Sequence, residues 1–326
     1  MPRLRQFVVA AALAACSSAA SAAFGGLFVF GDSLSDSGNI ALAIGANPAQ
    51  VITGNTYIPD QPYASGQFTN GNVWVRDLAS LLGLTPFGAP SLAGGGDFAF
   101  GGARVATDGA GLPPSVSAQV GQFLTDTGGV APSNALYVID GGGNDARDVL
   151  DAIAHGADPA AAIPLAASAF ATATGHLIDE LQAAGAQRIV VWDVPDVGKV
   201  PSVTALGSGA SFLATALASA MNSALVARLA IETPGVSLFD MFGLQDAAIS
   251  NPGAFGLVNV TDACGAPSNH CDAATALYWD GLHPTATVHA LIAGQIAAQV
   301  PEPSEVALML SGLALLGWRL RRARAR

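Results

Sequence analysis

The sequence predicts a single three-layer α/β/α domain built around a mainly parallel, five-stranded sheet. Short apolar runs alternate with longer stretches whose apolar residues recur at helical spacing. Most of the runs end at glycine or at small polar residues, which is typical of buried strands. No internal repeat and no convincing linker interrupts the alternation. Because parallel strands need helical crossovers that cover the faces of the sheet, this order of elements favours an α/β fold.

Five apolar runs have the length and the flanking residues of buried strands. The expected strands cover residues 27–30, 97–103, 135–139, 188–192 and 236–239. The expected helices cover residues 73–82, 115–127, 159–184, 211–231 and 285–299. Gly83 and Gly185 directly follow two of the helices, a position where glycine commonly ends a helix. Residues 41–70 show no period, so we expect a long surface segment that can form one wall of a substrate cleft.

Charge is distributed unevenly along the chain of 326 residues, of which 51% are hydrophobic and 11% charged. Only six of the 13 Lys and Arg lie between residues 24 and 300, against 22 of the 24 Asp and Glu, so this body carries a net charge of −16. Such an acidic body argues against nucleic acid and anionic lipid headgroups as partners.

The first 22 residues have the order of a secretory signal peptide. Two arginines precede an apolar run at residues 7–15, and ASA at residues 20–22 supplies a cleavage site of small residues. We expect cleavage after Ala22. The alternative is a lipoprotein, because LAAC at residues 13–16 also resembles a lipoprotein box that would lipidate Cys16.

Residues 301–326 are expected to form a second processing signal, which leaves residues 23–300 as the folded domain. The VPEP run, an apolar stretch at residues 306–318 and an arginine-rich end follow one another. This apolar stretch is short for a helix that spans a bilayer. The tail resembles a PEP-CTERM sorting signal, which implies a Gram-negative exporter, transient anchoring in the inner membrane and contact with sorting machinery. A simple tail anchor is the alternative; in either case we expect a secreted or cell-surface protein.

The cysteines agree with an exported protein. Cys16 lies in the signal, which leaves Cys264 and Cys271 as the pair in the body. In an oxidising compartment we expect them to form a disulfide, worth ~2–3 kcal/mol in the chain-entropy model. His270 is the only further metal ligand nearby, so we expect no zinc site.

The stretch GDSLSDSGN at residues 31–39 follows the first expected strand. A serine in a polar loop just beyond a strand end lies where a nucleophile is needed, and the backbone N–H groups around it can face an anion. Ser33 is therefore the candidate nucleophile. A plain polar turn is the alternative for these residues taken alone.

Two glycine-rich turns follow further strands. DFAFGGA at residues 97–103 contains Gly102, whose N–H is left unshielded by the missing side chain. DGGGND at residues 140–145 contains Asn144, a neutral amide donor that adds no competing charge at an oxyanion site. A nucleotide site would instead need a G-x-G-x-x-G run that opens into a helix, and this run is absent.

The stretch YWDGLHPT at residues 278–285 precedes the last expected helix. Asp280 and His283 are three residues apart on one loop, so the carboxylate can bond one imidazole nitrogen and leave the other free to face a serine. Asp280 would then fix the tautomer and stabilise the imidazolium that forms when His283 takes a proton. His270 is the only rival base, and it has no carboxylate placed in the same way.

These four stretches resemble blocks I, II, III and V of the SGNH (GDSL) hydrolases, in the order of that family. The resemblance implies a flavodoxin-like SGNH hydrolase fold and two-step acyl transfer without a metal or organic cofactor. It implies Ser33 as nucleophile, His283 as base and Asp280 as its orienter. It further implies an oxyanion hole that is made by the amides of Ser33 and Gly102 and by the Asn144 side chain.

The block II resemblance has one departure, because Asp97 stands where the family has asparagine. The resemblance implies an esterase or lipase that acts on small-molecule or lipid esters, and we expect a monomer. An acyltransferase, a phospholipase or a carbohydrate deacetylase could use the same residues, and a non-catalytic surface or matrix protein could use the same scaffold. The α/β-hydrolase fold is disfavoured because the G-x-S-x-G elbow is absent.

Overall fold

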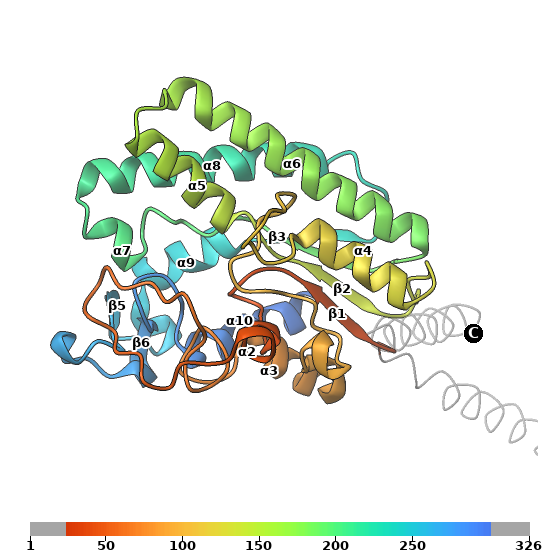
Figure 1. The fold of residues 1–326 in the computed structure, drawn as a ribbon, viewed down its shortest axis with the longest axis horizontal. Helices are drawn as coiled ribbons and strands as arrows, with labels where there is room; N and C mark the ends of the chain where they lie inside the picture. Colours follow the sequence, from red (N-terminus) through yellow and green to blue (C-terminus); the bar gives the residue numbers. More distant parts are fainter. Residues whose placement is uncertain (1–23, 301–326) are drawn as a thin grey trace, which may run out of the picture.

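The computed structural model describes residues 24–300 (Figure 1). The expected signal peptide with Cys16 and the expected sorting tail at 301–326 lie outside the described residues. Both domain boundaries therefore stay predictions.

Four parallel strands form the main sheet, in the order β1-β2-β3-β4. They are β1 (Leu27–Phe30), β2 (Leu136–Ile139), β3 (Ile189–Trp192) and β4 (Val236–Phe239). A second, two-stranded parallel sheet is made by β5 (Asn259–Ala263) and β6 (Ala276–Tyr278). The first three strands are almost wholly buried, as expected for apolar parallel strands that are covered on both faces.

Helices cover both faces of the main sheet (Figure 1), which confirms the three-layer α/β/α prediction. One layer contains α4 (Val116–Asp126), α5 (Gly143–Ala154), α6 (Pro159–Ala184) and α8 (Ser208–Leu229). The other contains α3 (Trp74–Leu81), α9 (Met241–Ser250) and α10 (Ala286–Gln299). Two short helices, α2 (Asn39–Ile44) and α7 (Pro201–Thr204), lie in loops at the carboxyl ends of the strands.

Five short 3-10 turns lie in the remaining connections of the described chain. They cover Thr85–Gly88, Ser91–Ala93, Pro252–Phe255, Pro267–Asn269 and Ala273–Thr275.

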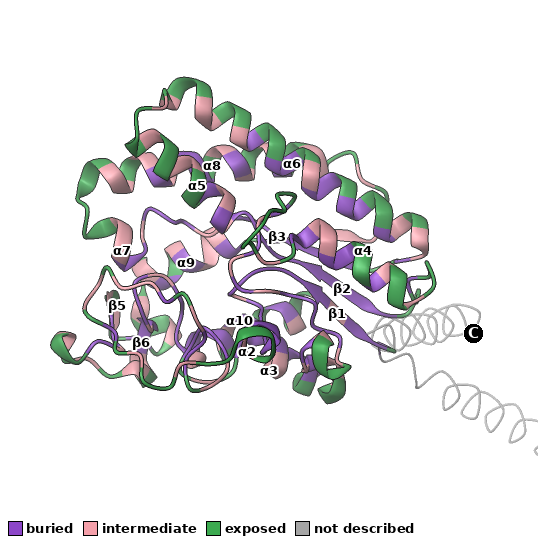
Figure 2. Ribbon diagram, viewed as in Figure 1, coloured by how far each residue is buried: buried purple, intermediate pink, exposed green. Residues whose placement is uncertain are grey.

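Alternate strand residues divide the core into two parts. Phe30 and Ile139 pack toward the layer of α4, α6 and α8, whereas Val29 and Val138 pack toward the layer of α3 and α10. Figure 2 shows the strands buried and the outward faces of the helices exposed. The period of two along each strand produces this division, because successive side chains point to opposite faces of a sheet.

Local signals in the sequence fix the ends of the longest helix. Asp158 accepts a hydrogen bond from the N–H of Ala160, Pro159 occupies the first helical position, and Gly185 follows the last turn with φ 117°. These are a side-chain cap, a residue with a helical φ and a left-handed terminus. The predicted helix over 159–184 is confirmed to the residue.

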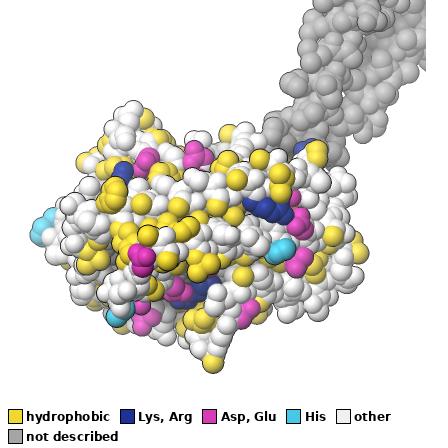
Figure 3. All heavy atoms as spheres, turned by 90° about the horizontal axis from the view of Figure 1, so that it is seen from above, with side chains coloured by type: hydrophobic (Ala, Val, Ile, Leu, Met, Phe, Trp, Pro, Cys, Tyr) yellow, Lys and Arg dark blue, Asp and Glu magenta, His cyan; other side chains and the backbone are white. Residues whose placement is uncertain are grey.

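Within residues 24–300, α6 and α8 have the length and apolar character of membrane spans. They also pack against each other and bury one face each in the core, as long core helices do. Figure 3 views the molecule from the side of these helices and shows apolar side chains gathered between scattered charges. Leu165, Leu206, Phe212 and Val226 are among the exposed apolar residues of α6, α8 and the loop before α8.

The prediction of a fifth strand over residues 97–103 is wrong in detail. This segment runs beside the free edge of β1, where Phe98 N donates to Val29 O (2.8 Å) and Phe100 N to Gly31 O (3.1 Å). It forms only an isolated bridge to β1. The side-chain amide of Asn39 donates to the carbonyls of Asp97 and Ala99, so two carbonyls that would face a further strand are already bonded.

Candidate active site

Three polar side chains from the two ends of the described chain meet at the carboxyl edge of the sheet. Nε2 of His283 lies 2.9 Å from Oγ of Ser33, and Nδ1 of the same ring lies 2.8 Å from Oδ2 of Asp280. Ser33 is 8% exposed, His283 2% and Asp280 0%. The predicted serine, imidazole and carboxylate therefore form one hydrogen-bonded row, shielded from bulk water.

The Asp280 carboxylate is held on both oxygens. Oδ1 accepts the backbone N–H groups of Leu282 and His283, each at 2.7 Å. Oδ2 accepts the phenol of Tyr63 at 2.7 Å in addition to the ring of His283. Sequence reasoning did not identify Tyr63, because it lies in the segment at 41–70 that has no period.

The serine loop is a tight turn organised by two aspartates. The carbonyl of Asp32 accepts the N–H groups of Ser35 and Asp36, and Oδ1 of Asp32 accepts that of Leu34 at 3.0 Å. The Asp36 carboxylate accepts backbone N–H groups from Gly38, Asn39, Ile40 and Gly101. Burial nevertheless raises the pKa of Asp36 to about 6. These bonds define the backbone path on either side of Ser33.

Backbone N–H groups near the serine are available to an anion. Among residues 24–300, neither the N–H of Ser33 nor that of Gly102 donates a hydrogen bond within the protein. Gly102 has φ 85°, in the left-handed region that favours glycine. Both residues therefore present free donors close to the end of β1.

Asn144 enters from the first turn of α5. Its Nδ2 donates to the carbonyl of Ala103 at 3.0 Å and to Oδ2 of Asp32 at 3.3 Å. The helix begins after Gly142, which has φ 98° and where a Cβ would lie 2.6 Å from Phe170. A glycine is therefore required at this position for α5 to start where it brings Asn144 to the serine loop.

The chain matches the sequence model of the GDSL-like lipase/acylhydrolase family over residues 27–296, most of its length. It belongs to this family. Membership confirms the predicted class of enzyme, a carboxylic ester hydrolase, and the matched range covers all four motifs.

Individual proteins are also similar to this chain. The GDSL esterase/lipase At1g73610 of Arabidopsis thaliana is 29% identical over 312 residues, which cover 84% of this chain and 88% of that protein. Esterase EstA of Pseudomonas aeruginosa is also 29% identical, over 94% of this chain, and the chain spans about half of the length of EstA, 52%. The lipase/acylhydrolase structure from Enterococcus faecalis is 14% identical and covers 84% of this chain and 93% of that one, with a TM-score of 0.41.

Asp97, which stands where the family motif has asparagine, supports the serine loop by hydrogen bonds to the backbone. Its Oδ2 accepts the N–H of Ser37 at 2.7 Å and its Oδ1 that of Ala99 at 3.0 Å. Burial, followed by the charge of Asp36, raises the pKa of Asp97 well above its usual value. Both side-chain oxygens are acceptors here, a role that an asparagine could fill with only one atom.

Further buried carboxyl groups surround the GDSL motif. Ser35 Oγ donates to Oδ2 of Asp140 at 2.7 Å. Burial, and then the charge of Asp32, raises the pKa of Asp140 well above its usual value. Burial also raises the pKa of Asp32, which the N–H of Leu34 partly opposes. Burial therefore disfavours the charged forms of these carboxyls next to the serine.

A cavity of about 540 Å³ opens from the serine into an apolar space. Ser33, Asn144 and His283 are among its lining residues. Many apolar side chains of the lining come from α5, α7, α8 and the loop before α8, among them Leu150, Ile153, Val203, Leu206 and Leu213. Thr56 and Ile58 also border the cavity, so part of the 41–70 segment does form a wall. A space of this size and lining accommodates an apolar chain.

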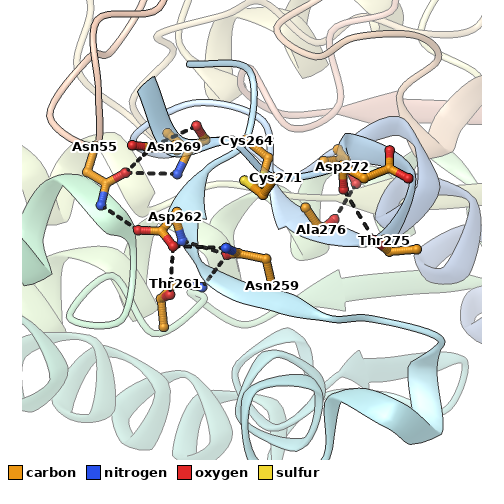
Figure 4. The surroundings of a disulfide bond; sticks show 12 residues. Asn55, Asn259, Thr261, Asp262, Cys264, Asn269, Cys271, Asp272, Thr275 and Ala276 are labelled. Carbon is orange, nitrogen blue, oxygen red and sulfur yellow. Dashed lines mark hydrogen bonds between the residues drawn. A yellow bond between two sulfur atoms is a disulfide. The ribbon is translucent and has the colours of Figure 1, made fainter. Parts of the chain in front are cut away.

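Cys264 and Cys271 are bonded, as predicted, and close a loop between β5 and β6 (Figure 4). His270 lies in this loop and has φ 50°. Its side chain is exposed, whereas that of His283 is buried. Among residues 24–300, no group of three or more metal-binding side chains comes together.

Proposed function

We propose that the chain is an exported serine esterase or lipase that works through Ser33, His283 and Asp280. The observation that carries the proposal is the continuous row of hydrogen bonds from Ser33 Oγ through the His283 ring to Asp280. A serine whose hydroxyl is bonded to an oriented imidazole is the arrangement that nucleophilic acyl transfer requires.

In the first half-reaction, Nε2 of His283 takes the proton of Ser33 Oγ while the oxygen attacks the ester carbonyl. The imidazolium that results is stabilised by Asp280, to which Nδ1 donates. Collapse of the tetrahedral intermediate breaks the bond to the alkoxy group, which leaves as the alcohol with the proton from Nε2. Water then attacks the acyl-enzyme by the same route and releases the acid.

The oxyanion is proposed to bind the N–H groups of Ser33 and Gly102 and the amide of Asn144. The first two donors are unused within the described protein, and Asn144 is held by its bond to Ala103 O. The longer bond from Asn144 to Asp32 is the one that an oxyanion would replace. Burial raises the pKa of Asp32, which disfavours a full negative charge on this carboxyl beside the developing oxyanion.

The substrate is proposed to be an ester with an apolar acyl chain. The cavity beside Ser33 is lined mainly by aliphatic side chains, and its charged residues are limited to Asp32, Arg147 and Asp151. Burial of methylene groups contributes ~0.8 kcal/mol each, so such a lining favours longer acyl chains over acetyl groups.

Export is proposed from two features of the sequence. The first 22 residues have the composition of a signal peptide, and the bonded pair Cys264 and Cys271 suits an oxidising compartment. The tail at 301–326 is proposed to contact sorting machinery in the inner membrane of a Gram-negative cell.

The test is hydrolysis of p-nitrophenyl esters from acetate to palmitate by the full chain and by Ser33→Ala. We expect Ser33→Ala to lose at least ~1,000-fold in kcat and to lose labelling by a fluorophosphonate probe. Ser37→Ala is the matched control, because this third serine of the loop makes no bond to His283 among the described residues. Activity that survives in Ser33→Ala would remove the proposed nucleophile; labelling without hydrolysis would indicate a transferase with another acceptor.

A further inference from the structure

The segment between α2 and α3 contacts both members of the acid–base pair. The phenol of Tyr63 donates to Asp280 Oδ2 at 2.7 Å. The ring of Phe68 lies 5.5 Å from that of His283, tilted by 30°. The N–H of Gly281, which immediately follows Asp280, donates to the carbonyl of Tyr57 at 2.8 Å. One segment therefore reaches the carboxylate, the imidazole and the backbone between them.

Tyr63 is fixed as a hydrogen-bond donor. It is 6% exposed and packs in a small apolar cluster with Ile52, Ala263 and Ala266. Its ring meets that of Trp279 edge-on at 5.9 Å. Burial, followed by the charge of Asp280, raises the pKa of Tyr63, so the phenol keeps its proton over the whole working range of pH. A phenol that cannot ionise can only donate to the carboxylate.

This donation completes the set of partners of Asp280. Its two oxygens accept four hydrogen bonds, from the N–H groups of Leu282 and His283, from the His283 ring and from Tyr63. Among residues 24–300, no Lys or Arg forms an ion pair with this wholly buried carboxylate. In the described part of the chain, Tyr63 is thus the only side chain besides His283 that stabilises the negative charge by a direct bond.

The segment is anchored next to the disulfide loop, which keeps Tyr63 in place. Nδ2 of Asn55 donates to Asp262 Oδ1 at 2.9 Å, and Oδ1 of Asn55 accepts Nδ2 of Asn269 at 2.7 Å (Figure 4). A Cβ on Gly281 would lie 2.6 Å from the carbonyl oxygens of Asn55 and Tyr57. Glycine is therefore needed after Asp280 for the segment to approach this closely.

We propose that Tyr63 is a positioning residue for the reaction, which holds the Asp280 carboxylate in line with the His283 ring and shares the charge of Oδ2 with it. The inference rests on the proposed function of Ser33, His283 and Asp280. It assigns to residues 52–68 a part in the chemistry, in addition to the wall that Thr56 and Ile58 supply to the cavity.

Removal of the phenol oxygen is expected to have two effects, one on the pH profile and one on kcat. Without a second donor, the whole charge of Oδ2 faces the imidazolium, which becomes easier to form and harder to discharge. The acidic limb of the kcat/KM profile then moves to higher pH, because more alkali is needed to make His283 a base. The freed carboxylate also loses its fixed orientation, which lowers kcat and leaves KM unchanged. The other titratable groups around the pair are Asp32, Tyr57 and His289, and none of these changes in the variant.

The test compares the full chain with Tyr63→Phe and Tyr137→Phe on a p-nitrophenyl ester over the range of pH in which the protein stays folded. In Tyr63→Phe we expect kcat to fall ~10-fold with KM unchanged and the acidic limb to rise by ~0.5–1 pH unit. Tyr137→Phe is the matched control, because it also removes a phenol that donates one hydrogen bond, to Pro132 O at 2.9 Å, but in the core away from the site. We expect it to leave both readouts as in the unaltered chain.

A second readout does not depend on turnover. The proton between His283 Nδ1 and Asp280 should give a low-field proton NMR signal in the unaltered chain and in Tyr137→Phe, and its position should change in Tyr63→Phe. An unchanged acidic limb together with an unchanged signal in a folded Tyr63→Phe overturns the inference alone. Activity that persists in Ser33→Ala instead overturns the proposed function, whatever the tyrosine variants do.

Discussion

Gln119 and Gly31 form a reciprocal pair of hydrogen bonds between α4 and the end of β1. The N–H of Gly31 donates to Oε1 of Gln119 at 2.8 Å, and Nε2 of Gln119 donates to the carbonyl of Gly31 at 2.9 Å. A side-chain amide thus takes the place that a neighbouring strand would occupy. Because Gly31 lies two residues before Ser33, this pair determines how the chain leaves the sheet and enters the serine loop.

We therefore expect Gln119→Leu to destabilise the fold by ~2 kcal/mol, since the buried N–H of Gly31 loses its acceptor and the carbonyl of Gly31 keeps only the N–H of Phe100. The value of kcat should fall as the serine loop loses its support. Gln122→Leu is the matched control, one turn on along α4, because among residues 24–300 the exposed side chain of Gln122 bonds only Asp126. Denaturant unfolding and ester hydrolysis of the two variants measure these effects, and equal stabilities would show that the pair contributes nothing.

Stability is expected to decrease as the pH rises from about 4 to about 7. Burial raises the pKa of Asp36 to about 6 and that of Asp193 to about 7. The folded chain therefore holds protons that the unfolded chain has already released, and this advantage disappears as the pH rises through the folded values. We expect a Tm that is roughly 5 °C higher at pH 5 than at pH 8.

Asp193→Asn tests the source of this dependence. An asparagine can keep the acceptor for the N–H of Phe242, which Asp193 Oδ1 now bonds at 2.9 Å. The variant should be more stable than the unaltered chain at pH 8, by ~1–3 kcal/mol, and its stability should vary less with pH. A Tm that rises between pH 5 and pH 8 in the unaltered chain would contradict the argument.

Leu213→Trp is expected to shorten the acyl chain that the enzyme prefers. Leu213 lines the cavity from α8, and a larger ring there removes space from the cavity. The ratio of kcat/KM for dodecanoate to that for butanoate should fall ~10–100-fold. Phe212→Trp is the control, because Phe212 is 79% exposed and does not line the cavity. Equal ratios in the two variants would show that acyl chains bind elsewhere.

Reduction of the bond between Cys264 and Cys271 is expected to lower both stability and activity. The bond closes a loop with a sequence separation of 7, for which the chain-entropy model gives ~2–3 kcal/mol. The N–H of Gly265 in this loop donates to the carbonyl of Trp279, next to Asp280. The two effects are measured by thermal unfolding and ester hydrolysis of the Cys264→Ser/Cys271→Ser variant, compared with the oxidised chain. Unaltered activity would show that the disulfide loop does not support the active site.

Much of the site could be predicted because its residues lie at strand ends, where short motifs carry their own spacing. Asp280 and His283 lie on one loop, so their contact could be predicted from their spacing of three residues in the sequence. The main strands could be predicted from short apolar runs, and the long helices, such as α6, from apolar residues at helical spacing. Ser33 lies on another element, and its approach to His283 required the order of the strands as well as the motifs.

Tyr63 and Phe68 could not be predicted in the same way. They lie in a segment without period, whose path depends on long-range bonds such as that from Asn55 to Asp262. The strand β5 was also missed, because its residues NVTDA are polar and partly exposed. The cavity depends on the distances between α5, α7 and α8, which no local pattern encodes.

The hydrogen bond between Ser33 and His283 joins positions 250 residues apart. A contact of such long range closes a large loop and is formed late, after the local helices and the neighbouring strands have assembled. The nucleophile loop therefore stays without its base until the loop before α10 has docked. Hydrolytic activity should thus be the last property to return on refolding, which makes it a kinetic marker for completion of the native state.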